Sequence, residues 1–298
     1  MENSDVKIIK EEKSFKQKLQ PWGYLLPTIV ILAIFMFIPF FQTIIRSLFF
    51  TDNFGKMQNF IGLNNYIELL TSGSFWNSVW VSFRFVLVVV LVGVVLGFVS
   101  ALLTQKAFPG LAFFSTSYAT PMAIASVGMA LIFQVMLNPS VGIINKILGA
   151  QGNMLADPGK ALVIVAILTA WLNSGMNYLY FSSGLASISD SLYEAASIDG
   201  ANGFQQFLNI TIPALRPTTF FVIVTNIINA FQSFGQINIL TKGGPGESTN
   251  VIVFDIYREA FMNYRYGFAS AESVILFLII LALTILMFYI RSKGGKVQ

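Results

Sequence analysis

The chain of 298 residues is 55% hydrophobic and only 11% charged, whereas a soluble domain carries about 25% charged residues. This composition excludes most soluble globular proteins and predicts a membrane protein. The chain has no cysteine and no histidine, which excludes disulfides, thiolate nucleophiles and imidazole-based catalytic or metal sites. Its formal net charge of +4 is small, and basic residues gather near both ends, which favours a cytoplasmic membrane surface over nucleic acid as the partner.

Six runs of the sequence are long enough and apolar enough to cross a bilayer, which takes about 20 residues. None of them alternates as the strands of a membrane barrel do. The sequence therefore predicts an all-α integral membrane protein with six transmembrane helices. In chain order they lie at 22–45, 85–105, 111–137, within 161–189, within 217–241 and at 273–290.

The two ends of the chain indicate its orientation and its domains. Five lysines precede the first run, and Arg291, Lys293 and Lys296 follow the last, so the positive-inside rule places both termini in the cytoplasm. The first run is too long for a cleaved signal peptide and no small-residue cleavage site follows it. We expect a cytoplasmic segment at 1–20, one membrane domain at 21–291 and a cytoplasmic tail at 292–298.

The cytoplasmic loop at about 187–213 predicts a short helix–turn–helix. Ser191 and Glu194 have the spacing of a capping box, and Gly200 stands where a left-handed residue would end the first helix. A second amphipathic stretch follows, and Pro213 is expected to end it. Periodicity alone favours no more than an amphipathic connector at the membrane surface.

The sequence of this loop is more specific than its periodicity. Glu-Ala-Ala is followed after three residues by Gly, after nine more by Ile, and two residues later by Ile-Pro; the matching positions are Glu194, Ala195, Ala196, Gly200, Ile210 and Pro213. The loop thus resembles the EAA loop of permease subunits of binding-protein-dependent ABC importers, with Ile212 in place of the usual Leu.

Further segments extend this resemblance along most of the chain. They are similar to segments of the carbohydrate branch, of the maltose- and glycerol-3-phosphate-permease type, and to the first permease of a heterodimeric pair. The segments are NFIGLNNYIELL at 59–70, LNPSVGIINKIL at 137–148, ILTKGGPGEST at 239–249 and FASAESVILFLIILALT at 268–284.

The resemblance implies a type I importer fold and a partnered machine in the bacterial cell membrane. A second homologous permease would complete the pathway, two ATPase subunits would bind ATP and magnesium on the cytoplasmic side, and an external binding protein would deliver the sugar. This chain would be no enzyme and would hold no cofactor and no metal. The residues implied to meet the ATPases are Glu194, Ala195, Ala196, Asp199 and Gly200.

One glycine-rich stretch, at 242–249, was tested as a phosphate-binding loop. Its lysine precedes the glycines, and Glu247 would repel phosphate, so it does not fit a P-loop. ATP, if it drives transport, is therefore expected to bind another chain.

Neutral amide and hydroxyl side chains in the fourth and fifth spans are the candidate substrate contacts, because they offer the donors and acceptors that sugar hydroxyls need. On continuous helices they share a face within each span, except Gln232, which lies beside the arc of the other four residues of the fifth span. Hydrogen bonding between helices is the alternative role, but in the resembled family the substrate site lies in these two spans. The residues are Asn226, Asn229, Gln232, Ser233 and Gln236 in the fifth span and Asn173 and Asn177 in the fourth.

Arg84, in the segment VSFRFVLV, is the one charge expected inside a span. Its guanidinium either reaches the external interface or an acidic partner, or it attracts an anionic substrate such as an acidic sugar or glycerol 3-phosphate.

Three other functional classes were weighed. A self-sufficient secondary carrier usually buries acids in its spans and shows inverted repeats, and the six runs have neither. A scaffold or receptor would have no use for an EAA loop, and an intramembrane enzyme lacks its usual catalytic residues here. We predict the permease of an importer for a mono- or oligosaccharide, with a glycerol-3-phosphate permease or a secondary carrier as alternatives.

Overall fold

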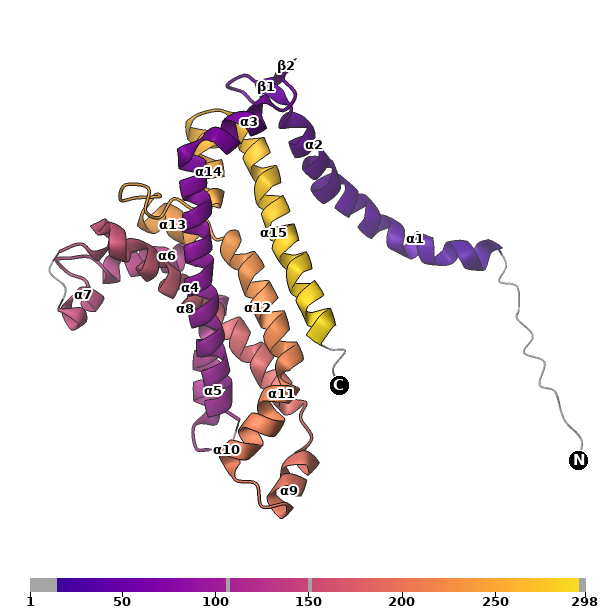
Figure 1. Cartoon of the computed structure of the whole chain (residues 1–298), viewed down its shortest axis with the longest axis vertical. Helices are drawn as coiled ribbons and strands as arrows, with labels where there is room; N and C mark the ends of the chain where they lie inside the picture. Colours follow the sequence, from indigo (N-terminus) through magenta and orange to yellow (C-terminus); the bar gives the residue numbers. More distant parts are fainter. Residues whose placement is uncertain (1–14, 106–107, 150–151, 295–298) are drawn as a thin grey trace, which may run out of the picture.

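The molecule is an elongated helical body with one small sheet at one end (Figure 1). The computed structural model describes residues 15–105, 108–149 and 152–294, so most of the predicted terminal segments 1–20 and 292–298 lies outside the described residues. The strands β1 (Phe49–Thr51) and β2 (Met57–Phe60) mark one end, hereafter the hairpin end. The helix α9 (Asp190–Ile198) marks the other, hereafter the α9 end. Helices dominate because a chain in hydrocarbon must satisfy its backbone hydrogen bonds internally.

The first helix leaves this body. It runs through α1 (Phe15–Leu32), the π turn η1 (Ala33–Phe37) and α2 (Ile38–Arg46). The π turn ends two residues before Pro39, which has no N–H for a regular helical bond. The apolar window within Tyr24–Arg46 has no buried residue, and α1 runs out to the side of the other helices in Figure 1. Most of the surface of this helix therefore faces the surroundings of the chain, and α2 packs against α15 through contacts such as Phe40 with Phe277.

The centre of the body is the pair α4 (Gly73–Leu103) and α8 (Pro158–Ala186). Each begins at a capping residue, because the side chain of Ser72 accepts from the N–H of Phe75 and that of Asp157 from the N–H of Gly159. The two helices approach closely at Gly97, where an added Cβ would lie 2.4 Å from the Cβ of Asn177. Only glycine fits this position.

Buried side chains form two main clusters along this pair. The first cluster lies toward the hairpin end and the second toward the α9 end. Helices in hydrocarbon associate through close van der Waals contacts of this kind. The first includes Val81, Phe85, Val89, Val165, Ala170, Ile237 and Ile252, and the second includes Ala101, Tyr178, Phe181, Leu185, Leu215 and Val222.

The third predicted span is broken. It consists of α5 (Leu111–Ala119), the 3-10 turn η2 (Thr120–Ala123) and α6 (Ser126–Met136), bent by 103° where Ile124 and Ala125 are extended. Pro121 at the start of the 3-10 turn has no N–H to continue the helix. The predicted span at 111–137 is therefore a sharply bent pair of helices. The short α7 (Ile143–Leu148) and η3 (Met154–Ala156) follow.

The fifth predicted span is also interrupted. Helix α12 (Arg216–Phe231) ends at Phe231, residues 232–234 are not helical, and α13 (Gly235–Leu240) begins a new helix. Before α12, the segments α10 (Gly203–Gln206), η4 (Phe207–Thr211) and α11 (Ile212–Ala214) meet it at a bend of 59°. The chain over 217–241 is thus two helices with different axes.

The remaining helices lie at the hairpin end or start there. α3 (Asn64–Thr71) follows the strands, α14 (Ile252–Tyr257) and the π turn η5 (Arg258–Met262) follow the loop after α13, and α15 (Tyr266–Gly294) runs back along the body. Within the described residues, four helices are long and apolar enough to span a membrane, and six spans result if each bent pair counts as one. The predicted number is the upper value of this range.

Candidate functional site

The α9 end presents a helix–turn–helix. α9 ends at Ile198, and Gly200, directly after the capping residue Asp199, has a φ of +82°, the left-handed conformation predicted from the sequence. α10 begins three residues later. The two halves are fastened side chain to side chain: the Oη of Tyr193 and the Oγ1 of Thr211 lie 2.9 Å apart, and the Nε2 of Gln206 donates to the Oγ of Ser197 at 2.8 Å. The two helices of this loop are therefore held together by side-chain hydrogen bonds, and the loop is not a flexible connector.

Two details of this loop differ from the sequence prediction. The capping residue of α9 is Ser189, without a side-chain capping bond, so the expected box of Ser191 and Glu194 is wrong. A capping box does exist at the next helix, where Asn202 and Gln205 bond to each other's backbone N–H groups. Pro213 does not end the second helix: it is the second residue of α11, and the π turn η4, which ends at Thr211, accommodates its missing N–H.

The residues of the EAA pattern lie at the tip of this unit. Glu194, Ala195, Asp199 and Gly200 are exposed, and Ala196 is half-buried. Large apolar side chains beside them are exposed as well; they are Leu192, Ile198 and Phe204. An exposed patch of apolar side chains with a carboxylate at its edge is a surface suited to a partner protein. The contact with an ATPase stays a prediction.

Midway along the body, amide side chains of α8 and α12 line a pocket of about 220 Å³. Asn177 and Asn226 are buried and exchange two hydrogen bonds: Asn177 Nδ2 donates to Asn226 Oδ1 at 3.2 Å, and Asn226 Nδ2 to Asn177 Oδ1 at 2.7 Å. Asn173 on α8 and Asn229 on α12 also line this pocket; Asn173 is half-buried and Asn229 is exposed. Two predicted residues thus join the helices, and two remain able to bind a ligand.

Three other predicted residues lie outside this pocket lining. Gln232 is exposed after the end of α12, Ser233 donates back to the carbonyl of Asn229 at 3.1 Å, and Gln236 is buried on α13. The continuous polar arc expected over 226–236 does not form, because the helix stops at Phe231. A substrate role for these three residues stays a prediction.

Arg84 is exposed on α4, with its guanidinium 5.8 Å from the ring centroid of Trp80, one turn earlier. It does not line the amide pocket. Stacking on an aromatic face is the arrangement expected for the interfacial alternative, and contact with an anionic substrate stays untested.

A larger cavity, of about 780 Å³, lies between the helix–turn–helix and the ends of α4 and α8. Its polar lining includes Thr104, Tyr178, Tyr193 and Thr211. The hydroxyl of Thr104 donates to Tyr178 Oη at 3.3 Å. This cavity could not be predicted from the sequence, because its walls come from three separate segments of the chain.

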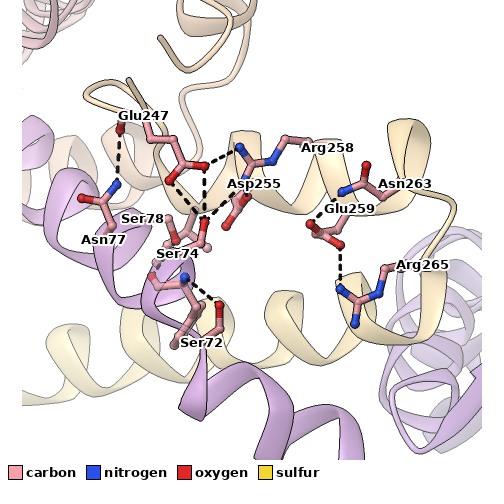
Figure 2. A network of polar contacts seen from close by, with 12 residues as sticks. Ser72, Ser74, Asn77, Ser78, Glu247, Asp255, Arg258, Glu259, Asn263 and Arg265 are labelled. Atoms are coloured by element: carbon pink, nitrogen blue, oxygen red, sulfur yellow. Dashed lines mark hydrogen bonds and ion pairs between the residues drawn. The ribbon is translucent and has the colours of Figure 1, made fainter. Parts of the chain in front are cut away.

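The hairpin end carries an ionic network that the sequence analysis also missed (Figure 2). Arg258 bonds to Glu247 at 2.9 Å and to Asp255 at 2.5 Å, and Glu247 also accepts from Ser74 at 3.4 Å. Asn77 donates to the carbonyl of Glu247 at 3.3 Å. The network thereby ties the start of α4 to the loop after α13 and to α14. Burial raises the pKa of Asp255, more than the guanidinium of Arg258 lowers it.

A second arginine extends the network. Arg265 bonds to Glu259 at 3.3 Å and to Glu68, and Asn263 donates to Glu259 at 2.9 Å. Close by, Glu272 is fully buried in the second turn of α15. The sequence analysis placed this acid outside the last span, because the uncharged run begins at Ser273, whereas the helix begins at Tyr266.

Comparison with known proteins gives concordant matches. Residues 93–293 match the family model described as the binding-protein-dependent transport system inner membrane component. The sn-glycerol-3-phosphate transport system permease of Agrobacterium fabrum is 37% identical over 283 residues, which cover 94% of this chain and 97% of that protein. The corresponding protein of Escherichia coli O157:H7 is 31% identical and covers 94% and 96%.

Solved structures match over nearly the whole fold. A bacterial ABC transporter involved in the import of the acidic polysaccharide alginate superposes with a TM-score of 0.82, over 93% of this chain and 96% of that chain, at 23% identity. The alginate transporter in complex with a pentasaccharide-bound periplasmic protein gives a TM-score of 0.80 over 91% and 93%, also at 23% identity. At this identity the likeness concerns the fold.

Proposed function

This chain belongs to the family of binding-protein-dependent transport system inner membrane components, and we propose that it forms, with a second homologous permease, the pathway for a hydroxyl-rich substrate. It is the permease of an ABC sugar importer, a multi-pass membrane protein and not itself an enzyme. The second permease, the separate ATPase subunits and the residues at which they act are part of the proposal.

One observation carries the proposal: the helix–turn–helix at the α9 end connects the two helices that line the amide pocket. α8 carries Asn173 and Asn177 and is followed by α9 after the three non-helical residues 187–189, and α12 leads from the bend at Leu215 to Asn226 and Asn229. A displacement of the loop therefore reaches both walls of the pocket through stiff helices. This geometry suits a permease in which ATP-driven movement changes access to the substrate.

The proposed orientation places the α9 end in the cytoplasm and the hairpin end outside. The exposed patch around Glu194 and Gly200 would then contact an ATPase subunit. ATP and magnesium would bind to that subunit and not to this chain. The first helix, with no buried residue in its apolar window, leaves ample surface for a further membrane-embedded partner. The binding protein would approach the hairpin end.

The substrate is proposed to be a mono- or oligosaccharide. The relatives are named for glycerol 3-phosphate and the structural neighbours for an acidic polysaccharide, so both an acidic sugar and glycerol 3-phosphate remain candidates. The amide pocket is lined by neutral side chains, which match hydroxyl groups better than a phosphate. This observation favours the sugar over glycerol 3-phosphate.

Uptake measurements separate these substrates. Cells or proteoliposomes carrying the complete transporter would be given a labelled neutral oligosaccharide, an acidic oligosaccharide and glycerol 3-phosphate in turn. The paired substitution Asn173→Ala with Asn229→Ala should weaken half-saturation of the true substrate about 10-fold, since each lost hydrogen bond costs about 0.5–1.5 kcal/mol. Gln42→Ala, an exposed amide on α2, is the matched control. Unchanged uptake in the paired variant would refute the pocket assignment.

The contact with the ATPases is tested separately. Glu194→Lys reverses the charge of an exposed side chain, so the permease should still fold while the co-purifying ATPase is lost. Asp190→Lys reverses the charge of the other acid of α9, also exposed, and serves as the control. An ATPase that stays bound to the Glu194→Lys variant would show that this patch is not its docking surface.

A further inference from the structure

The end of α15 farthest from the hairpin carries an arginine stacked on the neighbouring helix. The guanidinium carbon Cζ of Arg291 lies 4.6 Å from the ring centroid of Phe220 on α12. The same ring meets Phe288, one turn before Arg291, edge to face, with 5.1 Å between the centroids. α12 and α15 pack against each other along this stretch (Figure 1). The arginine therefore bridges two helices, and the ring beneath it holds the plane of its guanidinium.

The donors of this guanidinium are unused within the described part of the chain. The side chain of Arg291 forms no ion pair and no hydrogen bond with any described residue, whereas Arg258 and Arg265 are each bonded to two acids. Arg291 is also exposed. Its planar fork of N–H groups, which matches the paired oxygens of a carboxylate or a phosphate, is thus available to a group outside the chain.

A second arginine lies one helical turn from the same ring. Arg216 is the first residue of α12 and precedes Phe220 by four positions, so the two share a face of that helix. It is exposed and forms no ion pair with a described residue. The sequence has no acid between Asp199 and Glu247 and none after Glu272. Two cations on adjacent helices without a local acid repel each other, so an external anion beside them is stabilised.

The surface that surrounds these arginines is apolar. Phe221 on α12 and Ile285, Tyr289 and Ile290 on α15 are large side chains with 48% to 62% of their surface exposed. A contiguous exposed apolar surface of this kind is typical of contact with a membrane or a partner. An anion that binds here with apolar chains attached would cover this surface as well, which is the chemistry of a phospholipid rather than of free phosphate.

We propose that Arg291 and Arg216 bind the phosphate group of an anionic phospholipid, whose acyl chains lie along the exposed side chains of α15. The phosphate oxygens accept from the fork of Arg291, and Phe220 keeps that fork in place. In the orientation proposed above, this is the cytoplasmic leaflet, whose surface carries anionic lipid. The bound lipid links the start of α12, the helix that follows the helix–turn–helix, to the last helix of the chain.

Lys293 supplies a matched control, because it is an exposed cation of the same helix end that points to another side. It follows Arg291 by two positions, which is about 200° around the helix. Its Nζ lies 4.6 Å from the ring centroid of Tyr289, on its own helix. Lys293→Gln therefore removes the same charge as Arg291→Gln and leaves the proposed site intact.

Native mass spectrometry of the complete transporter in detergent, titrated with phosphatidylglycerol, measures this binding. Arg291→Gln should weaken the affinity for the tightest-bound lipid about 10-fold, because charge-assisted hydrogen bonds are lost. Lys293→Gln should weaken it by less than about 2-fold, and zwitterionic phosphatidylcholine should not replace phosphatidylglycerol. Equal losses in the two variants would mean that the lipid responds only to overall charge, and an unchanged affinity in Arg291→Gln would mean that its guanidinium holds no lipid. Either result would overturn the proposal.

Two further arms test the stacking and the source of the phosphate. Phe220→Leu keeps every charge but removes the ring, so it should weaken the affinity about 2- to 5-fold; an unchanged affinity would refute the stacked site. Inorganic phosphate should not displace the lipid, because it cannot cover the apolar side chains; displacement at millimolar concentration would show that the site takes free phosphate instead. Because none of these measurements uses substrate or uptake, their failure would leave the proposed transport function untouched.

Discussion

The close approach of α4 and α8 makes Gly97→Ala the most informative single substitution. A Cβ at this position would lie 2.4 Å from the Cβ of Asn177 and 2.9 Å from its backbone carbonyl carbon. Carbon atoms in contact prefer about 3.5–4.0 Å, so the two helices must move apart by about 1 Å. Neither contact is with the end of a flexible side chain, and the strain cannot be relieved by a change of rotamer.

The expected loss follows from two opposing terms. Overpacking a well-packed interior costs about 1–3 kcal/mol, while replacing glycine by alanine inside a helix contributes about 0.5–1 kcal/mol in the opposite direction. Gly97→Ala should therefore lower the free energy of unfolding by about 1–2 kcal/mol. A loss of 1.4 kcal/mol would change the ratio of folded to unfolded protein about 10-fold.

Two glycines supply the matched controls. Gly128, on α6, has no atom within 4 Å of an added Cβ, and at Gly93 the nearest atom is the side-chain Nδ2 of Asn177 at 3.2 Å. Unfolding by a denaturing detergent in mixed micelles should rank the alanine variants at 128, 93 and 97 in decreasing stability. If Gly97→Ala were as stable as Gly128→Ala, the two helices would not approach as described.

Three further predictions concern the polar contacts. A double-mutant cycle of Asn177→Ala and Asn226→Ala in the same unfolding assay should give a coupling energy of about 0.6–1.7 kcal/mol; strictly additive losses would refute the reciprocal bond. Arg258→Gln leaves the buried Asp255 without its cation and should lower the free energy of unfolding by about 1–3 kcal/mol. Arg265→Gln loses ion pairs that are more exposed to solvent and should lower it by less than about 1 kcal/mol. Equal losses in the two variants would contradict this ranking. Asn202→Ala removes the capping box and should lower the free energy of opening of α10, measured by amide hydrogen exchange, by about 1 kcal/mol. Ser191→Ala should leave this free energy unchanged. Equal protection in the wild type and both variants would show that the cap has no role.

The positions of the spans were predictable, because apolar runs are local properties of the sequence. Their interruptions were not. The unwinding at 232–234 occurs without a proline or glycine inside it, although Gly235 follows directly. A helical wheel extended across that point placed Gln236 beside Asn226, and the change of axis separates them. Local periodicity cannot report a change of axis that tertiary packing imposes.

In the candidate site too, features local to the sequence were predictable and features that depend on tertiary packing were not. The amides of α8 and α12 were identified by residue type, but the mutual bond between Asn177 and Asn226 depends on how two distant helices pack. The capping box at Asn202 and Gln205 had a readable signal, an Asn followed three residues later by Gln, but Ser191 and Glu194 have the same spacing and were predicted instead. Glu272 was missed because a search for uncharged runs ends a span at its first charge, whereas the helix continues beyond it.

The hydrogen bonds between the two halves of the helix–turn–helix restrict how many residues this loop can contain. Solvent-exposed loops usually tolerate insertions and deletions. Here, one residue added within a helix would rotate everything beyond it by about 100° and advance it by about 1.5 Å. Such a change between Ala186 and Arg216 would break the bond of Tyr193 to Thr211 or turn Asn226 away from Asn177. The residue count of this exposed loop is therefore as constrained as a core position, and homologous chains should vary in length at the 52–56 turn before they vary here.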